Sequence, residues 1–559
     1  MANNGQIEVV ELEIRGMTCE DCAHHVSTAL RGVSGVQEAT VPGWESRHAE
    51  VKLDAATSSG ALVEAVRAAG YGAKVFSRRS VEADREGDGS HRGDDCDLIV
   101  IGSGGAGMAA AIRAAEGGHR TVIIEAGVVG GTCVNIGCVP SKTLIRAAEA
   151  YHRAGHHGFE GVRTRAEGVE WKAVLNQKED LVAGLRQTKY LDVLASYETI
   201  TLVRRRATLR SDGSVILDDG RVLRSAKIVV ATGASPRILP LRGIDEVPVL
   251  TSTSLMALER RPESLLVIGG RAAALELGQA FARFGTRVTI LQRSAALLSD
   301  HEPEVSEAIE RYLTEEGIEI HTGVQPIAVR REGGGTVVTA SANGVEREYR
   351  AQQVLMAVGR VPKTEGLGLE EAGIEVDGHG FIIVDEEMRT SNPKVYAAGD
   401  VTNRPKLVYV AAAGGSLAAD NALNGTRAPL DVSVVPGVVF TDPQVATVGL
   451  TEREARAKGY NVKTGVLPLE YVPRALAARD TRGLVKLVAD ADTDRLLGGH
   501  VVAPEGGEII QTLTLSIKFG IRVSDLVGTL FPYLTLGEGV KLAAQTFEKD
   551  LARLSCCAG

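Results

Sequence analysis

The sequence predicts a multidomain chain of the α/β and α+β classes. We expect a ferredoxin-like βαββαβ module, two Rossmann-like domains and an α+β C-terminal domain. The 559 residues, 44% of them hydrophobic, are too many for one domain and apolar enough for several cores. Residues 1–76 alternate between strand-like and helix-like patterns. Two later segments each consist of a buried strand, a glycine-rich turn and a helix.

Composition excludes several classes of protein. A net charge of −9 argues against a nucleic-acid partner. No apolar run is long enough for a membrane-spanning helix, so we expect no membrane insertion. The N-terminal residues lack the charged and apolar regions of a signal peptide. We therefore expect a cytoplasmic protein, whose cysteines are reactive thiols more often than structural disulfides.

Six of the seven cysteines occur as three pairs. These pairs are Cys19 with Cys22, Cys133 with Cys138, and the adjacent Cys556 and Cys557. Adjacent cysteines are poorly placed for an ordinary disulfide but suit a soft metal ion held as thiolates. The alternative for the last pair is an unimportant tail. The seventh cysteine, Cys96, begins a strand and is given no role.

The N-terminal module carries the first pair. Its predicted strands are residues 9–14, 36–41, 48–53 and 73–76, and its predicted helices are 20–31 and 58–70. The sequence GMTCEDC spans the first strand-to-helix junction, where a helix N-terminus favours thiolates. It resembles the GMTCxxC signature of heavy-metal-associated domains, which implies metal binding by Cys19 and Cys22. A thioredoxin-like redox pair is the alternative, but the order of elements argues against it.

Residues 77–95 are rich in charge, glycine and serine and nearly free of apolar side chains. This composition predicts a flexible linker, so the module in front of it is expected to swing.

A dinucleotide-binding pattern follows the linker. After the strand at residues 97–101 come Gly102, Gly104 and Gly107 in the spacing GxGxxG, and then a helix. The next strand ends in Glu125, 23 residues past the first glycine. Such glycines let a pyrophosphate approach the helix N-terminus, and the acid binds a ribose. A glycine turn in a generic α/β fold is the alternative reading.

The most specific motif is GGTCVNIGCVPSK at residues 130–142. It resembles the redox-active disulfide motif of the pyridine nucleotide–disulfide oxidoreductases. That resemblance implies an FAD enzyme in which Cys138 lies against the flavin ring and Cys133 faces the substrate. It also implies that Lys142 lies near the flavin and pairs with Glu276.

The second glycine-rich turn is altered. Arg271 replaces the second fingerprint glycine after Gly269 and Gly270. The position matching the ribose-binding acid is Gln292, followed by Arg293. Without a carboxylate, and with arginine adjacent, a 2′-phosphate is favoured, so we expect NADPH rather than NADH. A solvated Arg293 is the competing reading.

The family resemblance covers roughly residues 96–555 and implies domain boundaries and further cofactor contacts. The predicted domains are 1–76 (heavy-metal-associated), 77–95 (linker), 96–240 (FAD-binding, first part), 241–364 (NADPH-binding), 365–435 (FAD-binding, return) and 436–559 (dimerisation, with a metal-binding tail). The predicted cofactor-binding residues, beyond those already named, are Gly105, Thr132, Ala231, Thr232, Gly233, Gly359, Gly399 and Asp400.

One departure from the disulfide reductases points to the substrate. Those enzymes use a histidine near the C-terminus to protonate a leaving thiolate. Here Tyr533 stands in its place, and no histidine follows His500. A packed interface aromatic is the alternative for Tyr533. Tyr190 matches a position that lines the substrate site in metal-reducing members of the family.

Together these features resemble the metal-reducing members of the family, and that resemblance implies reduction of thiol-bound Hg(II) to Hg(0) by a homodimer, with the metal delivered by small thiols or a carrier. Cys133, Cys138, Cys556 and Cys557 are the predicted metal-handling catalytic residues, with Tyr190 and Tyr533 beside them. Two alternatives remain open at this stage. One is a disulfide reductase, similar to dihydrolipoamide dehydrogenase, with a fused metal domain. The other is a metal-binding resistance carrier whose flavin is vestigial.

Overall fold

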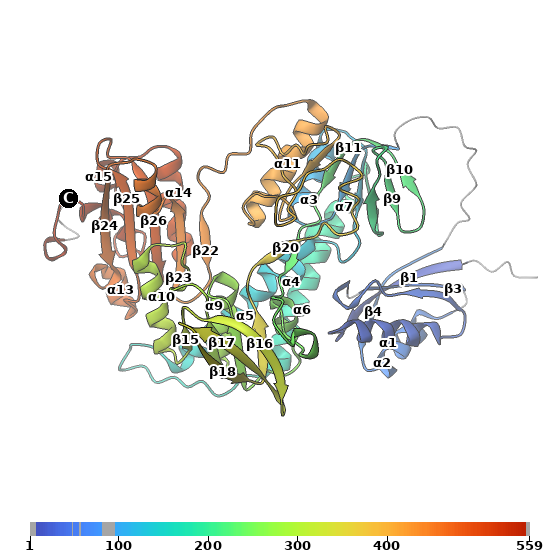
Figure 1. Cartoon of the computed structure of the whole chain (residues 1–559), viewed down its shortest axis with the longest axis horizontal. Helices are drawn as coiled ribbons and strands as arrows, with labels where there is room; N and C mark the ends of the chain where they lie inside the picture. The colour runs from blue at the N-terminus through green and yellow to red at the C-terminus, as the bar shows by residue number, and fades with distance from the viewer. Residues whose placement is uncertain (1–6, 47, 55–56, 81–94, 555–559) are drawn as a thin grey trace, which may run out of the picture.

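The structure is a computed structural model that describes residues 7–46, 48–54, 57–80 and 95–554. Cys556 and Cys557 lie outside these residues. Figure 1 shows an N-terminal module in blue, two nucleotide-binding domains in the middle of the molecule and a C-terminal domain in red. In the described residues no helix is long and apolar enough to cross a membrane.

The N-terminal module is the expected βαββαβ sandwich. Its antiparallel sheet has the order β2-β3-β1-β4. Alternate residues of β1, such as Val10 and Leu12, are fully buried under the two helices, so the intervening residues lie on the other face. Its elements are β1 (Ile7–Arg15), α1 (Glu20–Arg31), β2 (Val36–Thr40), β3 (His48–Asp54), α2 (Ser59–Ala68) and β4 (Gly72–Ser80).

The first nucleotide-binding domain is built on a parallel five-stranded sheet of order β21-β11-β5-β6-β7. Its central strand β5 is a nearly continuous apolar run, as expected for a strand covered on both faces. The chain leaves this domain and returns to it with β21 and α11, which packs beside α3. The elements are β5 (Cys96–Ile101), α3 (Gly105–Glu116), β6 (Thr121–Ile124), β7 (Ile200–Val203), β11 (Ser225–Val230), β21 (Val395–Ala397) and α11 (Val408–Asn424).

Between β6 and β7 the chain makes a long helical excursion that carries the redox motif. It comprises α4 (Gly131–Ile136), α5 (Cys138–Gly155), α6 (Trp171–Arg186), the π-helix η2 (Gln187–Leu191) and α7 (Asp192–Ala195). A small antiparallel sheet of β8 (Ala207–Leu209), β9 (Val215–Leu217) and β10 (Val222–Leu223) follows β7.

The second nucleotide-binding domain repeats the pattern with a parallel sheet of order β15-β14-β13-β19. Helix α9 packs against helix α5, which begins with Cys138, so this domain supports the redox motif. The elements are β12 (Ala234–Pro236), α8 (Ser252–Met256), β13 (Ser264–Ile268), α9 (Ala272–Arg283), β14 (Arg287–Leu291), α10 (Pro303–Glu315), β15 (Glu319–His321), β16 (Gln325–Glu332), β17 (Gly335–Ala342), β18 (Val345–Ala351), β19 (Gln353–Met356) and β20 (Arg360–Pro362).

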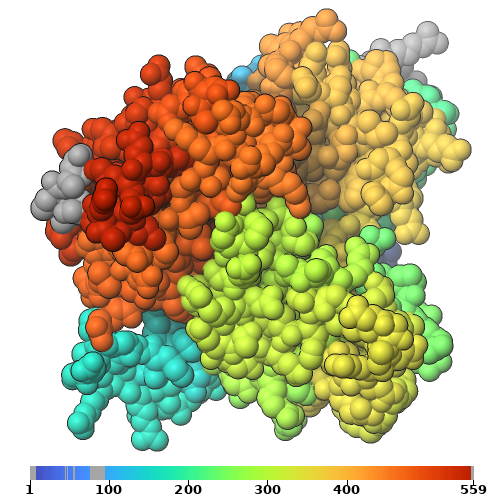
Figure 2. Space-filling model, turned by 60° about the vertical axis from the view of Figure 1, so that its left-hand side comes forward, coloured from blue at the N-terminus to red at the C-terminus, as the bar shows by residue number. Residues whose placement is uncertain are grey.

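The C-terminal domain has an antiparallel sheet of order β22-β23-β26-β25-β24. Figure 2 shows it lying against the second nucleotide-binding domain, and Val439, Val445 and Val502 share that domain's core. The elements are β22 (Gly437–Val439), β23 (Gln444–Gly449), α12 (Glu452–Ala457), β24 (Val462–Pro468), α13 (Pro473–Ala478), β25 (Leu484–Asp490), β26 (Leu496–Ala503), α14 (Gly506–Lys518), α15 (Val523–Gly528) and α16 (Glu538–Gln545).

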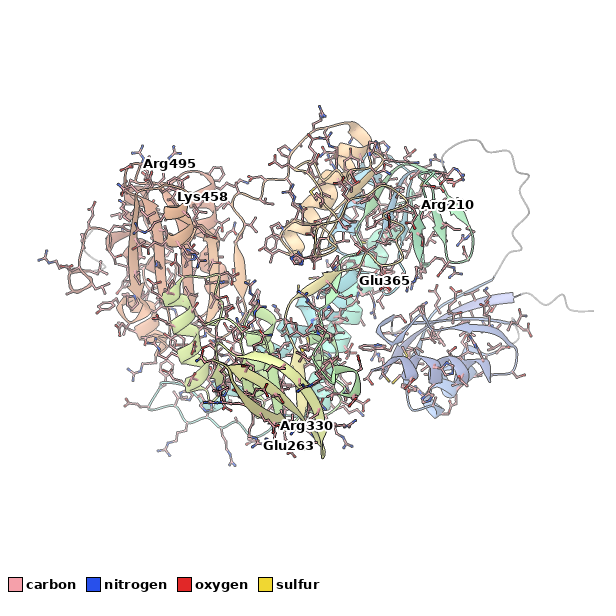
Figure 3. All side chains as sticks on the ribbon, viewed as in Figure 1. Arg210, Glu263, Arg330, Glu365, Lys458 and Arg495 are labelled. Atoms are coloured by element: carbon pink, nitrogen blue, oxygen red, sulfur yellow. The ribbon has the colours of Figure 1, made fainter. Side chains whose placement is uncertain are left out.

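The six side chains labelled in Figure 3 are all charged, and Arg330 lies at the lower edge of the view. Arg330 on β16 pairs with Glu332 and Glu348 at 2.7 and 2.8 Å, all of them exposed. Exposed pairs of this kind contribute little to stability. We therefore interpret this patch as a solvated sheet surface rather than a site.

Candidate active site

Two positions of the first fingerprint loop require glycine. Gly102 has φ +107°, and a Cβ there would lie 2.4 Å from the Ala231 carbonyl oxygen. A Cβ on Gly107 would lie 1.9 Å from the Gly102 carbonyl oxygen. The chain therefore turns tightly at the end of β5 and brings the N-terminus of α3 to the sheet edge, where a pyrophosphate is bound in such folds.

The acid at the end of β6 is held beside this loop. The Glu125 carboxylate accepts hydrogen bonds from the Ser103 amide at 2.9 Å, the Ser103 hydroxyl at 2.5 Å and the Gly127 amide at 2.7 Å. These bonds orient the carboxylate at the carboxyl edge of the sheet, which is the position that the ribose-binding role requires.

The return segment adds polar groups that suit a flavin dinucleotide. Gly399 has φ +81°, and burial raises the pKa of the neighbouring Asp400. Arg360 Nε lies 3.6 Å from Asp400 and is buried without a hydrogen-bond partner. The Arg360 Nη2 atom donates to Thr132 Oγ1 at 3.3 Å. A partly buried guanidinium whose Nε atom has no hydrogen-bond partner, placed between two predicted flavin contacts, fits an oxygen-rich ligand.

Arg360 was not among the predicted site residues. A signal was present in the sequence, because Arg360 directly follows the predicted contact Gly359. A single arginine after a glycine is too common to be singled out without the fold.

The redox loop is packed on the fingerprint loop. Gly130 and Gly131 have φ +105° and +63°, and a Cβ on Gly131 would lie 2.5 Å from the Cα of Gly104. A backbone approach this close, at a positive φ, requires glycine at position 131. The two cysteines that follow are thereby held next to the predicted flavin site.

Cys133 lies in α4, and Cys138 is the first residue of α5. The two side chains hydrogen-bond, which raises the pKa of Cys133 and lowers that of Cys138 to about 6. Burial acts against the ionisation of Cys138, while the positive charge of Lys142 favours it. One thiolate and one thiol at neutral pH is the protonation state that a dithiol nucleophile needs.

Lys142 joins three parts of the molecule. Its Nζ atom lies 2.7 Å from Glu276 Oε2 and 4.5 Å from the centre of the Phe440 ring. Glu276 comes from α9 and also accepts the Phe440 amide at 2.9 Å. The Lys142–Glu276 pair that the family resemblance implies is thus present in the structure.

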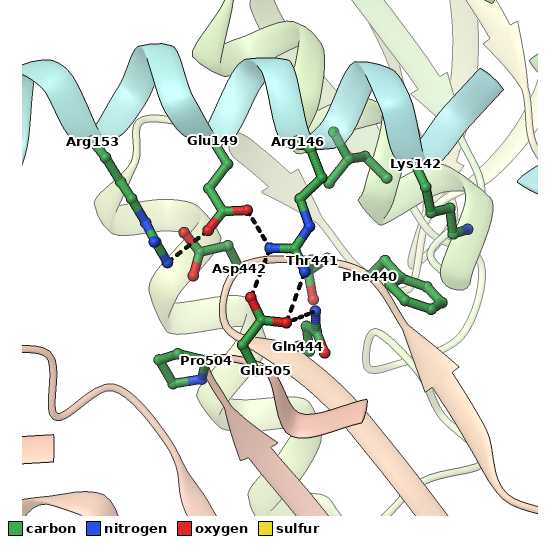
Figure 4. A pocket seen from close by; sticks show the side chains of 11 residues that line it. Lys142, Arg146, Glu149, Arg153, Phe440, Thr441, Asp442, Gln444, Pro504 and Glu505 are labelled. Atoms are coloured by element: carbon green, nitrogen blue, oxygen red, sulfur yellow. Dashed lines mark hydrogen bonds and ion pairs between the residues drawn. The ribbon is translucent and has the colours of Figure 1, made fainter. Parts of the chain in front are cut away.

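The redox helix is also tied to the C-terminal domain (Figure 4). Arg146 of α5 makes a bidentate contact with Glu505, at 2.8 and 2.7 Å, and pairs with Glu149 at 2.7 Å. Arg153 pairs with Glu149 from the next turn of the helix at 2.6 Å. This network fixes α5, and with it Cys138, against the C-terminal sheet.

The predicted metal-binding motif of the module lies at a helix N-terminus. Cys19 is the N-cap of α1, and its Sγ atom lies 3.1 Å from that of Cys22. Burial opposes ionisation of Cys22, but hydrogen bonds from the Thr18 backbone, Cys19 and Tyr71 outweigh it and lower the pKa of Cys22 to about 6. Cys19 is exposed, so the pair is open to solvent.

Comparison with known proteins identifies the family. Residues 96–415 match the pyridine nucleotide-disulphide oxidoreductases, 435–544 match the dimerisation domain of that family, and 11–72 match the heavy-metal-associated domain. Mercuric reductases from Staphylococcus aureus and Acidithiobacillus ferrooxidans are 43% and 46% identical to this chain, each over 98% of it and 99% of the relative. This chain belongs to the mercuric reductase family.

Solved structures support the fold of this mercuric reductase family member. LpdA from Mycobacterium tuberculosis is 30% identical, with a TM-score of 0.71 over 80% of this chain and 99% of that one. The HOCl-induced flavoprotein disulfide reductase RclA from Escherichia coli is 28% identical, with a TM-score of 0.73 over the same shares of both chains. The family is one of oxidoreductases that use a flavin and a nicotinamide cofactor, as the sequence predicts.

The two tyrosines predicted for the mercuric reductase site lie in different surroundings. Tyr190 lies in η2, and its ring would be 3.5 Å from a Cβ on Gly130. Burial, and then the charges of Cys133 and Cys138, raise its pKa, so Tyr190 lies at the redox pair. π-Helical turns often occur at functional sites. Tyr533 is 62% exposed on the C-terminal domain.

The second nucleotide site of this mercuric reductase family member keeps only part of the fingerprint. A Cβ on Gly269, whose φ is +126°, would lie 2.3 Å from the Ala357 carbonyl oxygen, so this glycine is required. Arg271 is the N-cap of α9, and its side chain pairs with Asp300 at 3.6 Å. Arg293 is exposed beside the buried Gln292 and is available to a phosphate.

The structure thus brings together Cys133, Cys138, Lys142 and Tyr190, and it places Cys19 and Cys22 in a separate module. Asn135, inside the redox motif, was missed by the sequence analysis as a contact residue. It donates to the carbonyl groups of Val129 and Gly131 at 3.0 and 2.9 Å.

Proposed function

We propose that this protein reduces thiol-bound Hg(II) to Hg(0) with electrons from NADPH. The observation that carries the proposal is the pairing, in one chain, of an exposed metal-binding dithiol at Cys19 and Cys22 with a redox dithiol at Cys133 and Cys138. Hg(II) is a soft cation and prefers thiolate ligands. Both pairs contain a cysteine with a pKa of about 6, so each presents a thiolate at neutral pH.

Ligand exchange moves the metal. A thiolate of the receiving pair attacks Hg(II), and one thiolate of the delivering complex is released with each new sulfur–mercury bond, by analogy with thiol–disulfide exchange. The family resemblance turns Cys133 towards the entering metal, and Cys138, whose thiol is the more acidic of the redox pair, supplies the second thiolate. Lys142 stabilises that thiolate, and Glu276 holds Lys142 in place.

The bound flavin supplies the two-electron chemistry. In the overall balance, NADPH and Hg(II) give NADP⁺, H⁺ and Hg(0). The cysteines keep their oxidation state and regain free thiolates when Hg(0) leaves. The Gly102–Gly107 loop, Glu125, Asp400 and Arg360 would hold the FAD.

NADPH is proposed over NADH because no carboxylate follows β14. Gln292 stands at that position, and the adjacent Arg293 is exposed. A guanidinium can pair with a 2′-phosphate, whereas a glutamine gives a ribose hydroxyl a weaker partner than a carboxylate would.

The working unit is proposed to be a homodimer in the cytoplasm, where a reducing milieu keeps the dithiols free. By the family resemblance, Cys556 and Cys557 of one subunit receive Hg(II) and pass it to the redox pair of the other. Tyr533 stands beside this route in place of an acid–base histidine.

A substrate comparison tests the proposal. NADPH oxidation by the holoenzyme is measured with Hg(II) as a thiol complex, with lipoamide and with oxidised glutathione. We expect turnover with the Hg(II)–thiol complex and none with lipoamide or oxidised glutathione. Turnover with a disulfide and none with Hg(II) would support the disulfide reductase, and no turnover with any of them would support a carrier with vestigial flavin chemistry.

A further inference from the structure

The N-terminal module rests on the first nucleotide-binding domain through charged side chains. Figure 1 shows the blue module beside α6 and α4, and ion pairs join the two. Glu13 lies 3.0 Å from Arg186, Glu50 lies 3.7 Å from Arg205, and Glu11 lies 3.9 Å from Arg204. In these three pairs the module is acidic and the body is basic.

The three glutamates lie on one face of the module's sheet, which also carries His48 and Arg15; Arg15 lies 3.8 Å from Asp180 of the body. Glu11 and Glu13 alternate with the buried residues of β1, and Glu50 is the direct cross-strand partner of Glu11. Like charges placed opposite each other on neighbouring strands are destabilising. In the docked arrangement Glu11 is only 6% exposed, and a carboxylate buried in this way needs a partner such as Arg204. This sheet face is therefore better satisfied when the arginines of the body cover it.

The contact extends to the redox loop. Arg186 donates to Glu13 at 3.0 Å through Nη2 and to Asn135 Oδ1 at 3.2 Å through Nη1. Asn135 lies between the two redox cysteines in sequence and bonds to the carbonyl groups on either side of Gly130. One unbroken chain of polar contacts thus runs from the module to the loop that carries Cys133.

The metal pair does not take part in this contact. Cys19 is exposed and Cys22 is partly exposed in the docked arrangement. The undescribed residues 81–94 could span up to about 50 Å when extended. The same chain can therefore hold its module here and also release it for delivery elsewhere.

The geometry points to a docking surface, formed by Arg186, Arg204 and Arg205, that holds the chain's own N-terminal module in a metal-loading position. In this position the acidic sheet face is covered and the dithiol is open to solvent. In this scheme the module must leave the docking surface before it delivers the metal. The loading role rests on the proposed function, whereas the docking does not.

Docking is tested on the full-length holoenzyme by small-angle scattering and by amide exchange of residues 186–191. Glu13→Lys should lower the docked population by about tenfold, since it reverses one charge of a partly buried pair. The protein should become more extended, and exchange of residues 186–191 should increase. Arg204→Glu should act in the same way, as should high salt, because salt screens these pairs.

Glu64→Lys is the matched control, because Glu64 is exposed on α2, on the opposite side of the module's sheet. The double change Glu13→Lys with Arg186→Glu should restore compaction. Identical scattering and exchange for wild type, Glu13→Lys and Glu64→Lys would overturn the docking surface.

A mixed dimer identifies which module docks. One subunit is full length and the other lacks residues 1–94, and Arg204→Glu is placed in either one. Loss of docking only when the change is in the full-length subunit supports docking within one chain. Loss only when it is in the truncated subunit would overturn it in favour of docking on the partner.

Alkylation of the reduced module tests the loading position separately. Cys19 and Cys22 should react with iodoacetamide at the same rate in wild type and in Glu13→Lys, because the docked pair is open. Slower alkylation in wild type, with docking intact, would show that the docked position shields the pair and would overturn the loading role alone.

Discussion

Close backbone contacts at glycines, which leave no room for a Cβ atom, fix the placement of the redox cysteines. Gly131 meets Gly104 with no room for a Cβ, and Gly107 meets the carbonyl of Gly102. These contacts stack the redox loop on the dinucleotide loop. The acidity of Cys138 then follows from its hydrogen bond with Cys133 and from Lys142 nearby. The redox geometry thus depends on the lack of a side chain at Gly107 and Gly131 as well as on the side chains of Cys133 and Lys142.

The two redox cysteines should differ spectroscopically. Cys133→Ala should retain the broad long-wavelength band of the two-electron-reduced holoenzyme, because the family places the Cys138 thiolate against the flavin. Cys138→Ala should lose the band, and both variants should lose Hg(II)-dependent NADPH oxidation while FAD stays bound. Absorption spectra during anaerobic NADPH titration provide the measurement. Retention of the band by Cys138→Ala alone would reverse the assigned roles.

The fingerprint glycine should be intolerant of a methyl group. Gly107→Ala places a Cβ 1.9 Å from a backbone oxygen, so we expect a loss of about 1–3 kcal/mol of stability and reduced FAD content. Gly184→Ala is the control, since that helical glycine has nothing within 4 Å and should gain about 0.5–1 kcal/mol. Thermal unfolding and the flavin absorbance per chain measure both. Equal FAD content and stability in the two variants would contradict the steric account.

At the scale of elements, patterns confined to short segments were predictable and long-range contacts were not. The βαββαβ order and both strand–turn–helix units were expected from periodicity and are present. Strand β4 instead continues to Ser80, past the predicted boundary at residue 76, because its polar end pairs with β1. At the other end of the predicted linker, the Asp95 carboxylate accepts the Arg224 amide at 2.8 Å. Composition indicates that these segments are polar, but it does not indicate the distant residues with which they pair.

Site residues divide in the same way. Motif residues such as Lys142 and Glu276 were predicted and meet at 2.7 Å. Arg186 and Arg360 act through partners far away in sequence, and nothing local distinguishes them from other arginines. The swinging module was expected from the linker's composition, which could not reveal the acidic sheet face and its arginine partners.

The sheet face of the module should respond to pH through His48 on β3. Burial, followed by the charge of Arg204, lowers the pKa of His48 to about 4, against the attraction of Glu11. Arg186 also faces it, and Glu13 is its cross-strand partner. An undocked His48 would regain its ordinary pKa of about 6.5. Below pH 6.5 the undocked state therefore binds a proton that the docked state does not.

Docking should accordingly weaken as the pH falls from 6.5 towards 4, by up to about tenfold per pH unit. Scattering between pH 7.5 and 5 measures it. His48→Gln should flatten the dependence. An equally steep dependence in His48→Gln would assign the effect to other groups.

At the scale of the whole molecule, the catalytic body should fold and remain active without its N-terminal module. Deleting residues 1–94, which keeps Asp95 and its bond to Arg224, should leave a folded, FAD-containing dimer. Turnover should be near normal when small thiols supply Hg(II). It should fall below that of the full chain when thiols are scarce, because a tethered carrier raises the local metal concentration. A folded truncation that is inactive at saturating small-thiol complex would make Cys19 and Cys22 catalytic.

The last step of the proposed route joins two subunits, and mixed dimers test it. Let one subunit lack Cys133 and Cys138 and the other lack Cys556 and Cys557. If the tail serves the partner's redox pair, the first subunit's tail and the second's redox pair make one working site. Turnover should then be about half that of wild type. If the tail serves its own subunit, neither chain is complete and the mixed dimer is inactive.

The two parent homodimers should be inactive on dithiol-bound Hg(II) under either arrangement, so activity in the mixture can only come from the mixed dimer. Reduction of the flavin by NADPH should persist wherever the FAD is bound, since electron entry uses neither the tail nor the redox pair. A mixed dimer that reduces its flavin yet turns over no Hg(II) would place the relay within one subunit. The metal and the electrons would then meet in a single chain, and dimerisation would serve only to support the fold.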